Sequence, residues 1–238
     1  MNKKNTLIAL LILIVLIVIG YVYFFGHHLK PAKIAVGPGP VPATVTNPAA
    51  CSKSQTFTNL LTAGSSTPST ICALNLQGQK IPSATGMFAQ FSNLKQLNLS
   101  FNMIASVSPD IGNLKSLVIL DLSYNEISSL PLGLGGLTKL YKLNLSDNAL
   151  SDLPSDLSGL SSLNQLSLSG NQFSSLPSVV TQIPSLVELD INNNPIKTLP
   201  DLSGLKNLSF LNIAGTKIPA SALPALQKEL PNTKIITK

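Results

Sequence analysis

The sequence contains no arginine: all sixteen of its basic residues are lysine, and only ten residues are acidic. A protein that binds nucleic acid usually contacts phosphates and guanine through arginine and gathers its basic residues into a stripe. Here the lysines are scattered along the chain. The net charge of +6 therefore indicates a solvated basic surface with a weak attraction to anionic partners, and we expect no nucleic-acid partner.

Histidine and cysteine are also scarce. The only histidines are His27 and His28, and the only cysteines are Cys51 and Cys72. Catalysis by a Ser-His-Asp or Cys-His site needs a base within hydrogen-bond reach of the nucleophile, and a zinc site needs several Cys or His ligands. We therefore expect no enzymatic activity, no catalytic residues, no cofactor and no metal site.

An eleven-residue phrase, L-x-x-L-x-L-x-x-N-x-L, recurs seven times within residues 71–218. The steps between copies are 23 residues five times and then 22, and the copies begin at Ile71, Leu94, Leu117, Leu140, Leu163, Leu186 and Leu208. Such a period is typical of a stack of small units that contact only their neighbours. The apolar and polar residues alternate through the middle of the phrase, which predicts a strand with one buried face in every copy.

The phrase resembles the leucine-rich repeat family. Copies two to four match it without a gap, as in Leu94-x-x-Leu97-x-Leu99-x-x-Asn102-x-Ile104. The resemblance implies an α/β solenoid of 23-residue repeats, with a curved parallel β-sheet on its concave side. Between the copies, Leu-Pro pairs such as Leu130-Pro131 discourage a long helix, so we expect irregular and 3-10 turns on the convex side.

Asparagine occupies position nine of five copies. Buried backbone groups in the bend after a strand need partners, and a carboxamide offers both donors and an acceptor. We therefore interpret these residues as an internal hydrogen-bonded ladder and not as ligand contacts: Asn102, Asn125, Asn148, Asn171 and Asn194.

Positions two, three, five, seven and eight of each copy are expected to point outward, and copies two to four carry most of the aromatic and charged residues there. The family resemblance implies that this concave face binds proteins, and aromatic residues rimmed by Lys and Asp are typical of a binding centre. The predicted partner-binding residues are Lys95, Phe101, Val118, Ile119, Asp121, Tyr124, Tyr141, Lys142 and Asp147. Two alternatives stay open: the face binds a carbohydrate or cell-wall polymer, or these side chains only stabilise the sheet.

The segments outside the repeats differ in composition. Residues 7–25 carry no charge and are long enough to cross a bilayer as one helix. No A-x-A-like cleavage site follows, so we favour an uncleaved signal-anchor over residues 1–25. Residues 26–50 hold five prolines and should form an extended linker. Residues 51–70 and 219–238 are interpreted as the two caps, the second with leucines at helical spacing.

Cys51 and Cys72 bracket the N-terminal cap. Many exported leucine-rich repeat proteins have a disulfide-bonded cap there, so the resemblance implies a structural bridge between these two cysteines. A bridge implies an oxidising compartment, which would place the repeats on the extracytoplasmic side of a cell membrane crossed once by the chain. Two buried thiols in a cytoplasmic protein remain the alternative.

Overall fold

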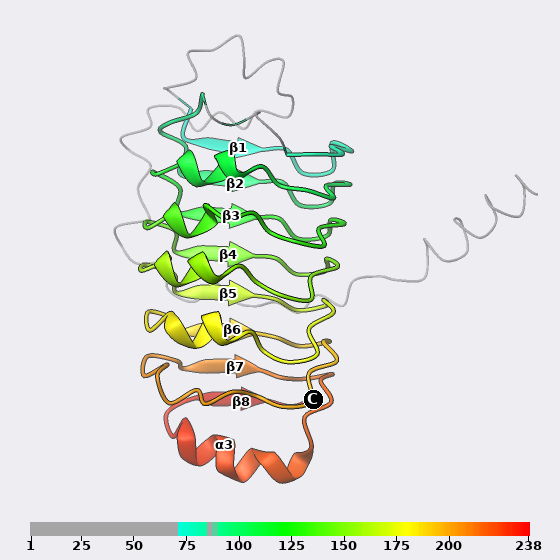
Figure 1. The fold of residues 1–238 in the computed structure, drawn as a ribbon, viewed down its shortest axis with the longest axis vertical. Helices are drawn as coiled ribbons and strands as arrows, with labels where there is room; N and C mark the ends of the chain where they lie inside the picture. Colours follow the sequence, from blue (N-terminus) through cyan, green and yellow to red (C-terminus); the bar gives the residue numbers. More distant parts are fainter. Residues whose placement is uncertain (1–70, 85–87, 89) are drawn as a thin grey trace, which may run out of the picture. The chain divides into compact units, whose positions relative to one another are not determined.

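The computed structural model describes residues 71–84, 88 and 90–238 of the chain. These residues form an eight-stranded parallel sheet whose strands follow one another in chain order (Figure 1). Each of the seven copies contributes one strand at its positions three to five, and an eighth strand follows. The strands are β1 (Ala73–Asn75), β2 (Gln96–Asn98), β3 (Ile119–Asp121), β4 (Lys142–Asn144), β5 (Gln165–Ser167), β6 (Glu188–Asp190), β7 (Phe210–Asn212) and β8 (Lys234–Ile236). The predicted parallel sheet is confirmed.

The copies pair without any offset. Leu74 of β1 lies opposite Leu97 of β2, which lies opposite Leu120 of β3, and the same register continues through β7. Equivalent positions therefore line up in columns across the sheet, and we name each column by its position in the phrase. Column eight, for example, contains the eighth residue of every copy.

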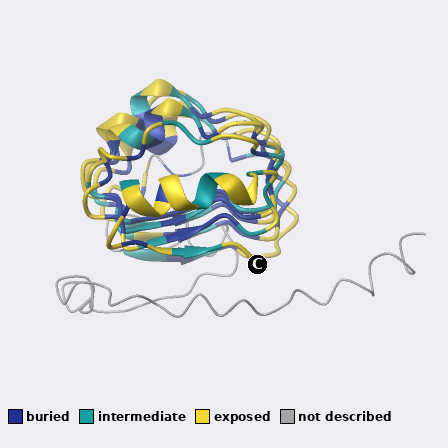
Figure 2. Cartoon of the chain, turned by 90° about the horizontal axis from the view of Figure 1, so that it is seen from below, coloured by how far each residue is buried: buried dark blue, intermediate teal, exposed yellow. Residues whose placement is uncertain are grey.

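The apolar columns form one continuous core. Leu94, Leu97 and Leu99, at positions one, four and six of the second copy, are at most 1% exposed, and their equivalents belong to the same buried cluster. Burial of each such side chain contributes roughly 1.5 to 3 kcal/mol. Figure 2, a view along the stack, shows the buried residues on the inner side of the sheet and of the facing turns.

The return segments of copies two to five form short 3-10 helices, which lie across the stack from the sheet (Figure 1). Their bounds are η3 (Pro109–Asn113), η4 (Leu134–Gly136), η5 (Ser155–Gly159) and η6 (Ser178–Gln182). The return segment of copy six, which is one residue shorter, consists of turns. The short convex elements agree with the expectation drawn from the Leu-Pro pairs.

Glycines let these 3-10 helices approach one another closely. A Cβ atom added at Gly135 would lie 1.8 Å from the carbonyl oxygen of Asp156, in the next copy, and one at Gly112 would lie 2.1 Å from that of Gly133. The Asp156 carboxylate in addition accepts hydrogen bonds from the N–H groups of Gly133 (2.6 Å) and Gly135 (3.2 Å). Because the first N–H groups of a helix have no partner within it, Asp156 caps η4 from the neighbouring copy.

The last repeat is followed by η7 (Ala220–Ala222) and α3 (Leu223–Glu229). Leu226 of α3 and the following Leu230 are buried against the core, and Figure 2 shows α3 lying across the end of the stack. The chain then adds β8 to the sheet beside β7. The last copy is therefore covered by a helix as well as a strand.

The predicted anchor, linker and N-terminal cap, residues 1–70, lie outside the described residues. Within the part of the chain that the structure describes, no helix is both long and apolar enough to cross a membrane.

The close approach at Gly135 predicts that Gly135→Ala is destabilising. The added Cβ would overlap the carbonyl of Asp156, and overpacking of this kind costs about 1 to 3 kcal/mol. The midpoint of thermal unfolding, followed by circular dichroism, should fall by several degrees.

The matched control is Gly204→Ala, because a Cβ there would meet its nearest atom, the carbonyl oxygen of Thr181, at 3.4 Å. This variant should unfold at the temperature of the parent chain. Equal unfolding temperatures for Gly135→Ala and Gly204→Ala would contradict the close packing of the convex side.

Candidate recognition surface

The asparagines of column nine connect each copy to the one before it. Oδ1 of Asn125 accepts a hydrogen bond from the N–H of Ile104 (3.0 Å), and its Nδ2 reaches the carbonyls of Leu99 (3.0 Å), Leu122 (3.0 Å) and Ser123 (3.1 Å). The same pattern of contacts is made by Asn102, Asn148, Asn171 and Asn194. These carboxamides are saturated by backbone groups and belong to the scaffold.

Column seven points inward in several copies, although it was expected to face outward. Ser123 is only 3% exposed. Oδ1 of Asp121, two residues earlier, accepts hydrogen bonds from both the N–H (2.9 Å) and the hydroxyl (2.6 Å) of Ser123, which turns the serine into the bend. Oδ2 of Asp121 accepts a hydrogen bond from Asn144 (3.3 Å). Asp121, predicted as a partner contact, thus has a partner within the scaffold for each carboxylate oxygen.

Every residue of column eight has a left-handed backbone, with φ between 52° and 69°: Gly78, Phe101, Tyr124, Asp147, Gly170, Asn193 and Gly215. The bend after each strand requires this conformation. It costs an L-residue roughly 1 to 2 kcal/mol, which glycine avoids. Side chains as bulky as phenylalanine and tyrosine are uncommon there.

The rings of Phe101 and Tyr124 stack on each other. Their centroids lie 4.2 Å apart, and their planes differ by 8°. Both stay accessible, with exposed fractions of 48% and 39%. A stacked pair contributes about 0.5 to 1.5 kcal/mol, which does not exceed the cost of two strained backbones. Stability of the fold alone therefore does not account for aromatic residues at these two places.

Asp147 continues column eight beyond Tyr124. Tyr124 donates a hydrogen bond to the Asp147 carboxylate, and partial burial together with this negative charge raises the pKa of Tyr124 above 10.0. Burial raises the pKa of Asp147, and the hydrogen bond from Tyr124 offsets part of that rise. A Cβ added at Gly170, in the next copy, would lie 2.4 Å from Oδ1 of Asp147. The carboxylate therefore lies between the aromatic pair and the fifth copy.

The other predicted contacts lie on the sheet face, in columns two and three. Ile119 is paired with Lys142 across β3 and β4. All members of this group are half-buried: Lys95, Val118, Ile119, Tyr141 and Lys142. The structure therefore divides the predicted residues into a sheet group and a group beyond the strand ends, Phe101, Tyr124 and Asp147.

Acidic residues of the sixth copy complete the surface. Desolvation raises the pKa of Glu188, while the positive charge of Lys142 acts in the opposite direction. Desolvation also raises the pKa of Asp190, and the negative charge of Asp147 raises it further. The hydrogen bonds that Asp190 accepts from Asn192 and Asn212 lower this pKa and offset part of the rise. The acidic side chains of this face thus lie in copies three, four and six: Asp121, Asp147, Glu188 and Asp190.

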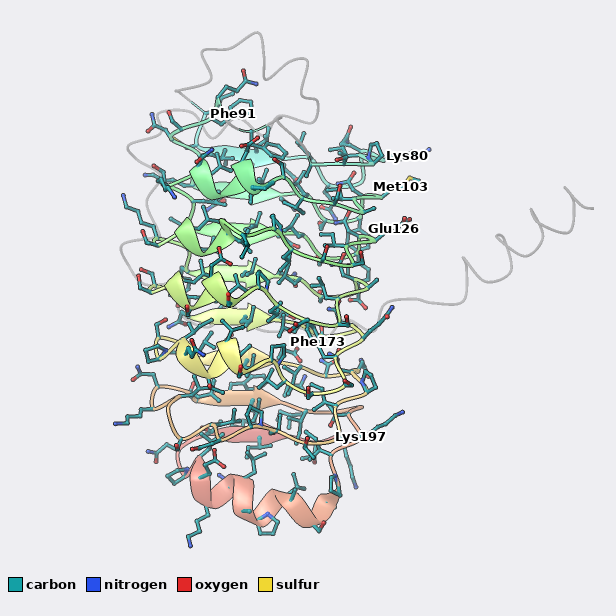
Figure 3. All side chains as sticks on the ribbon, in the orientation of Figure 1. Lys80, Phe91, Met103, Glu126, Phe173 and Lys197 are labelled. Atoms are coloured by element: carbon teal, nitrogen blue, oxygen red, sulfur yellow. The ribbon has the colours of Figure 1, made fainter. Side chains whose placement is uncertain are left out.

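Met103 is an exposed residue that the sequence interpretation did not include. It occupies column ten and is 51% exposed. Figure 3 shows it between Lys80 and Glu126 along the edge at which the strands end. The signal that could have revealed it is an apolar residue at position ten, a variable position of the repeated phrase, only two residues after Phe101.

Sequence comparisons agree with this geometry. A family profile described as "Leucine rich repeat" matches residues 92–150 and 115–173, and one described as "Leucine Rich repeats (2 copies)" matches residues 184–228. The chain belongs to the leucine-rich repeat family. Domains of this family are generally recognition modules without enzymatic activity, and they commonly bind proteins.

Two solved leucine-rich repeat structures illustrate the similarity. A leucine-rich repeat protein from Leptospira interrogans is 25% identical, with a TM-score of 0.51 over 77% of this chain and 58% of its own. An internalin from Listeria monocytogenes is 21% identical, with a TM-score of 0.54 over 71% of this chain and 56% of its own. This chain therefore spans less than two thirds of either protein. No curated protein matches it.

The leucine-rich repeat surface offers shape, apolar rings and charge. Among the described residues, no group of His, Cys, Asp or Glu is arranged to hold a metal ion. The arrangement suits non-covalent recognition, with an aromatic pair in copies two and three and carboxylates in copies three, four and six.

The raised pKa of Asp190 predicts a pH dependence of stability. Because the folded chain binds the proton more tightly than the unfolded chain, the free energy of unfolding falls as the pH rises above 3.8, through the raised pKa. Asp190→Asn removes this contribution, and asparagine already fills the same column at Asn144 and Asn212.

We expect the stability difference, variant minus parent, to grow between pH 4 and pH 7, whatever its value at pH 4. Urea unfolding at the two pH values measures it. A difference that shrinks with rising pH would contradict the assignment.

Proposed function

We propose that this chain is a membrane-anchored recognition protein whose leucine-rich repeats face the extracytoplasmic side and bind a partner protein without catalysis. The observation that carries the proposal is the exposed stack of Phe101 and Tyr124, held on strained backbone beside Asp147. Aromatic residues at the centre of an interface commonly supply most of its binding energy.

The surroundings of the stack support a protein partner. Ile119, Val118 and Tyr141 provide apolar area on the sheet face, and Lys95, Lys142 and Asp147 provide charges of both signs around it. An apolar centre with a charged rim is the usual composition of a protein interface. The columns also fix the spacing of these groups, so that binding orders few side chains.

The anchor and the location are proposed from the sequence. Residues 7–25 have the length and composition of a single membrane span, and the linker of residues 26–50 would hold the repeats away from the bilayer. Cys72 lies directly before β1. A bridge from Cys72 to Cys51 would close the N-terminal cap and would require an oxidising compartment.

Carbohydrate or cell-wall polymer is the second candidate ligand. The same exposed rings favour it, together with polar side chains on the same copies: Asn98 and Asn144 in column five, and Asp147 in column eight. Sugars bind aromatic faces while their hydroxyl groups exchange hydrogen bonds with carboxamides and carboxylates.

The double variant Ile119→Ala/Tyr124→Ala should lose the partner and keep the fold, because both side chains are at least partly exposed. We would compare capture of proteins by the full chain and by the variant, together with binding to an array of glycans. If the double variant no longer captures proteins that the full chain captures, protein recognition is supported. If it loses only the binding to glycans, the carbohydrate ligand is supported.

Leu132→Ala is the matched control, because Leu132 is a large apolar residue that is 67% exposed next to the convex element η4. It should bind like the parent chain. If the double variant still bound every ligand, columns three and eight would not form the binding site.

Thiol labelling tests the bridge and the side of the membrane together. Intact cells that produce the full chain are treated with a maleimide that does not cross membranes, with and without a reductant. The proposal expects labelling only after reduction. Labelling without reductant would exclude the bridge, and labelling only after the cells are opened would place the repeats in the cytoplasm.

A further inference from the structure

Among the residues that the structure describes, the aromatic stack is covered at one end and open at the other. Tyr124 covers one face of Phe101 at 4.2 Å, and on the far side of Tyr124 lies Asp147, which accepts its hydrogen bond. The opposite face of Phe101 is turned toward the first copy, where column eight is occupied by Gly78. Glycine places no side chain beside that face.

The space beside Phe101 is open among the described residues. A Cβ atom built on Gly78 would have one heavy atom within 4 Å, the carbonyl oxygen of Phe101, at 4.0 Å. The other two glycines of this column differ, because a Cβ on Gly170 would lie 2.4 Å from Asp147 and one on Gly215 would lie 2.3 Å from Asn193. Within the part of the chain that the structure describes, the column leaves room for another group next to an aromatic ring only at Gly78.

The spacing of the column suits a third ring. Parallel strands lie about 4.8 Å apart, which is close to the 4.2 Å between the two existing rings. A planar group placed over Gly78 would therefore continue the stack at the same interval. Aromatic rings stack favourably at centroid distances of about 4.5 to 7 Å, a range that includes one strand spacing.

The neighbouring side chains favour an aromatic residue of a protein as the occupant. Met103, which is 51% exposed, follows Phe101 by two residues, and a thioether makes favourable contacts with ring edges. The Asp147 carboxylate, which could hold sugar hydroxyl groups, lies at the other end of the stack, beyond Tyr124. The open end thus offers an aromatic face, and the exposed Met103 follows in the same copy, along the edge at which the strands end (Figure 3).

We propose that the face of Phe101 turned toward Gly78 receives a phenylalanine, tyrosine or tryptophan side chain of the partner protein, which continues the Phe101–Tyr124 stack as its third ring. This inference rests on the proposed function and adds the chemistry of the partner residue. It also gives a reason for the strained aromatic residues of copies two and three: together they hold one ring face in a fixed orientation.

The absence of tryptophan from the chain allows a direct test with a tryptophan probe. N-acetyltryptophan amide is titrated with the full chain, and binding is followed by the anisotropy of tryptophan fluorescence. The parent chain should raise the anisotropy saturably. N-acetylphenylalanine amide should compete with the probe, whereas N-acetylleucine amide and chitotriose should not.

Two variants test the position of the probe. Phe101→Gly, which carries the residue that the first copy has at this position, should weaken binding about two- to tenfold, as expected for the loss of one aromatic pair. Gly78→Tyr should fill the open end with the chain's own ring and weaken binding similarly. Gly78→Ala adds only a Cβ atom in open space and should bind about as well as the parent.

The outcomes separate this inference from the proposed function. Equal binding of the probe by the parent and by Phe101→Gly would overturn the inference. An anisotropy that does not rise with the parent chain would also overturn it. Either result leaves the proposed function standing if Ile119→Ala/Tyr124→Ala still abolishes capture of the partner protein. Stronger competition by chitotriose than by N-acetylphenylalanine amide would also overturn the inference, and would favour the carbohydrate ligand. Unfolding curves of all variants should show that each is folded at the temperature of the binding assay, which excludes loss of the fold as the cause. Gly78→Tyr and Gly78→Ala should unfold at a somewhat lower temperature than the parent, because Gly78 has a φ of 69°, and Phe101→Gly should not lose stability from backbone strain.

Discussion

Each strand ends in a bend where the backbone leaves the sheet and its polar groups turn toward an apolar interior. An unsatisfied buried group costs about 1 to 3 kcal/mol, and the carboxamide of column nine prevents that cost by reaching two copies at once, as Asn125 does with Leu99 and Leu122. The asparagine contacts in the bend therefore fix the position of each copy relative to the preceding copy. Copy seven ends the ladder, and its Thr216 donates only to Ile213 of its own copy (2.7 Å).

The same bend explains the row of side chains on which the proposed binding surface depends. Because all seven copies share one backbone path, each must place its eighth residue in the left-handed region. A side chain on that residue lies beyond the end of the strand, next to the equivalent side chains of the adjacent copies. The pairing of β2 with β3 and the contacts of Asn125 hold these two copies in step, so that Phe101 and Tyr124 stack. A structural requirement of the repeat thus produces a row of outward positions at regular intervals.

The period of the leucines was enough to predict the strands, their parallel order and the core, since every copy repeats the same alternation. It could not predict the left-handed backbone of column eight, because glycine marks this conformation in only three copies and Phe101 and Tyr124 conceal it in two others. The inward turn of Ser123 depends on one hydrogen-bonded neighbour, Asp121. The cap that Asp156 places on η4 joins residues 21 and 23 positions apart, and no local pattern reports it.

Side chains of adjacent copies in the same column interact in the unbound protein, since they are separated by a single strand spacing of about 4.8 Å. Tyr124 is held between Phe101 and Asp147, and the charge of Lys142 acts on Glu188 across the intervening copy. Side chains restrained in this way lose little conformational freedom on binding, which is a principal cost of forming an interface. A repeat surface therefore owes its capacity for recognition to contacts along its own columns. Change at one position alters the groups on both sides of it, so the columns, and not single residues, are the units in which such a surface can vary.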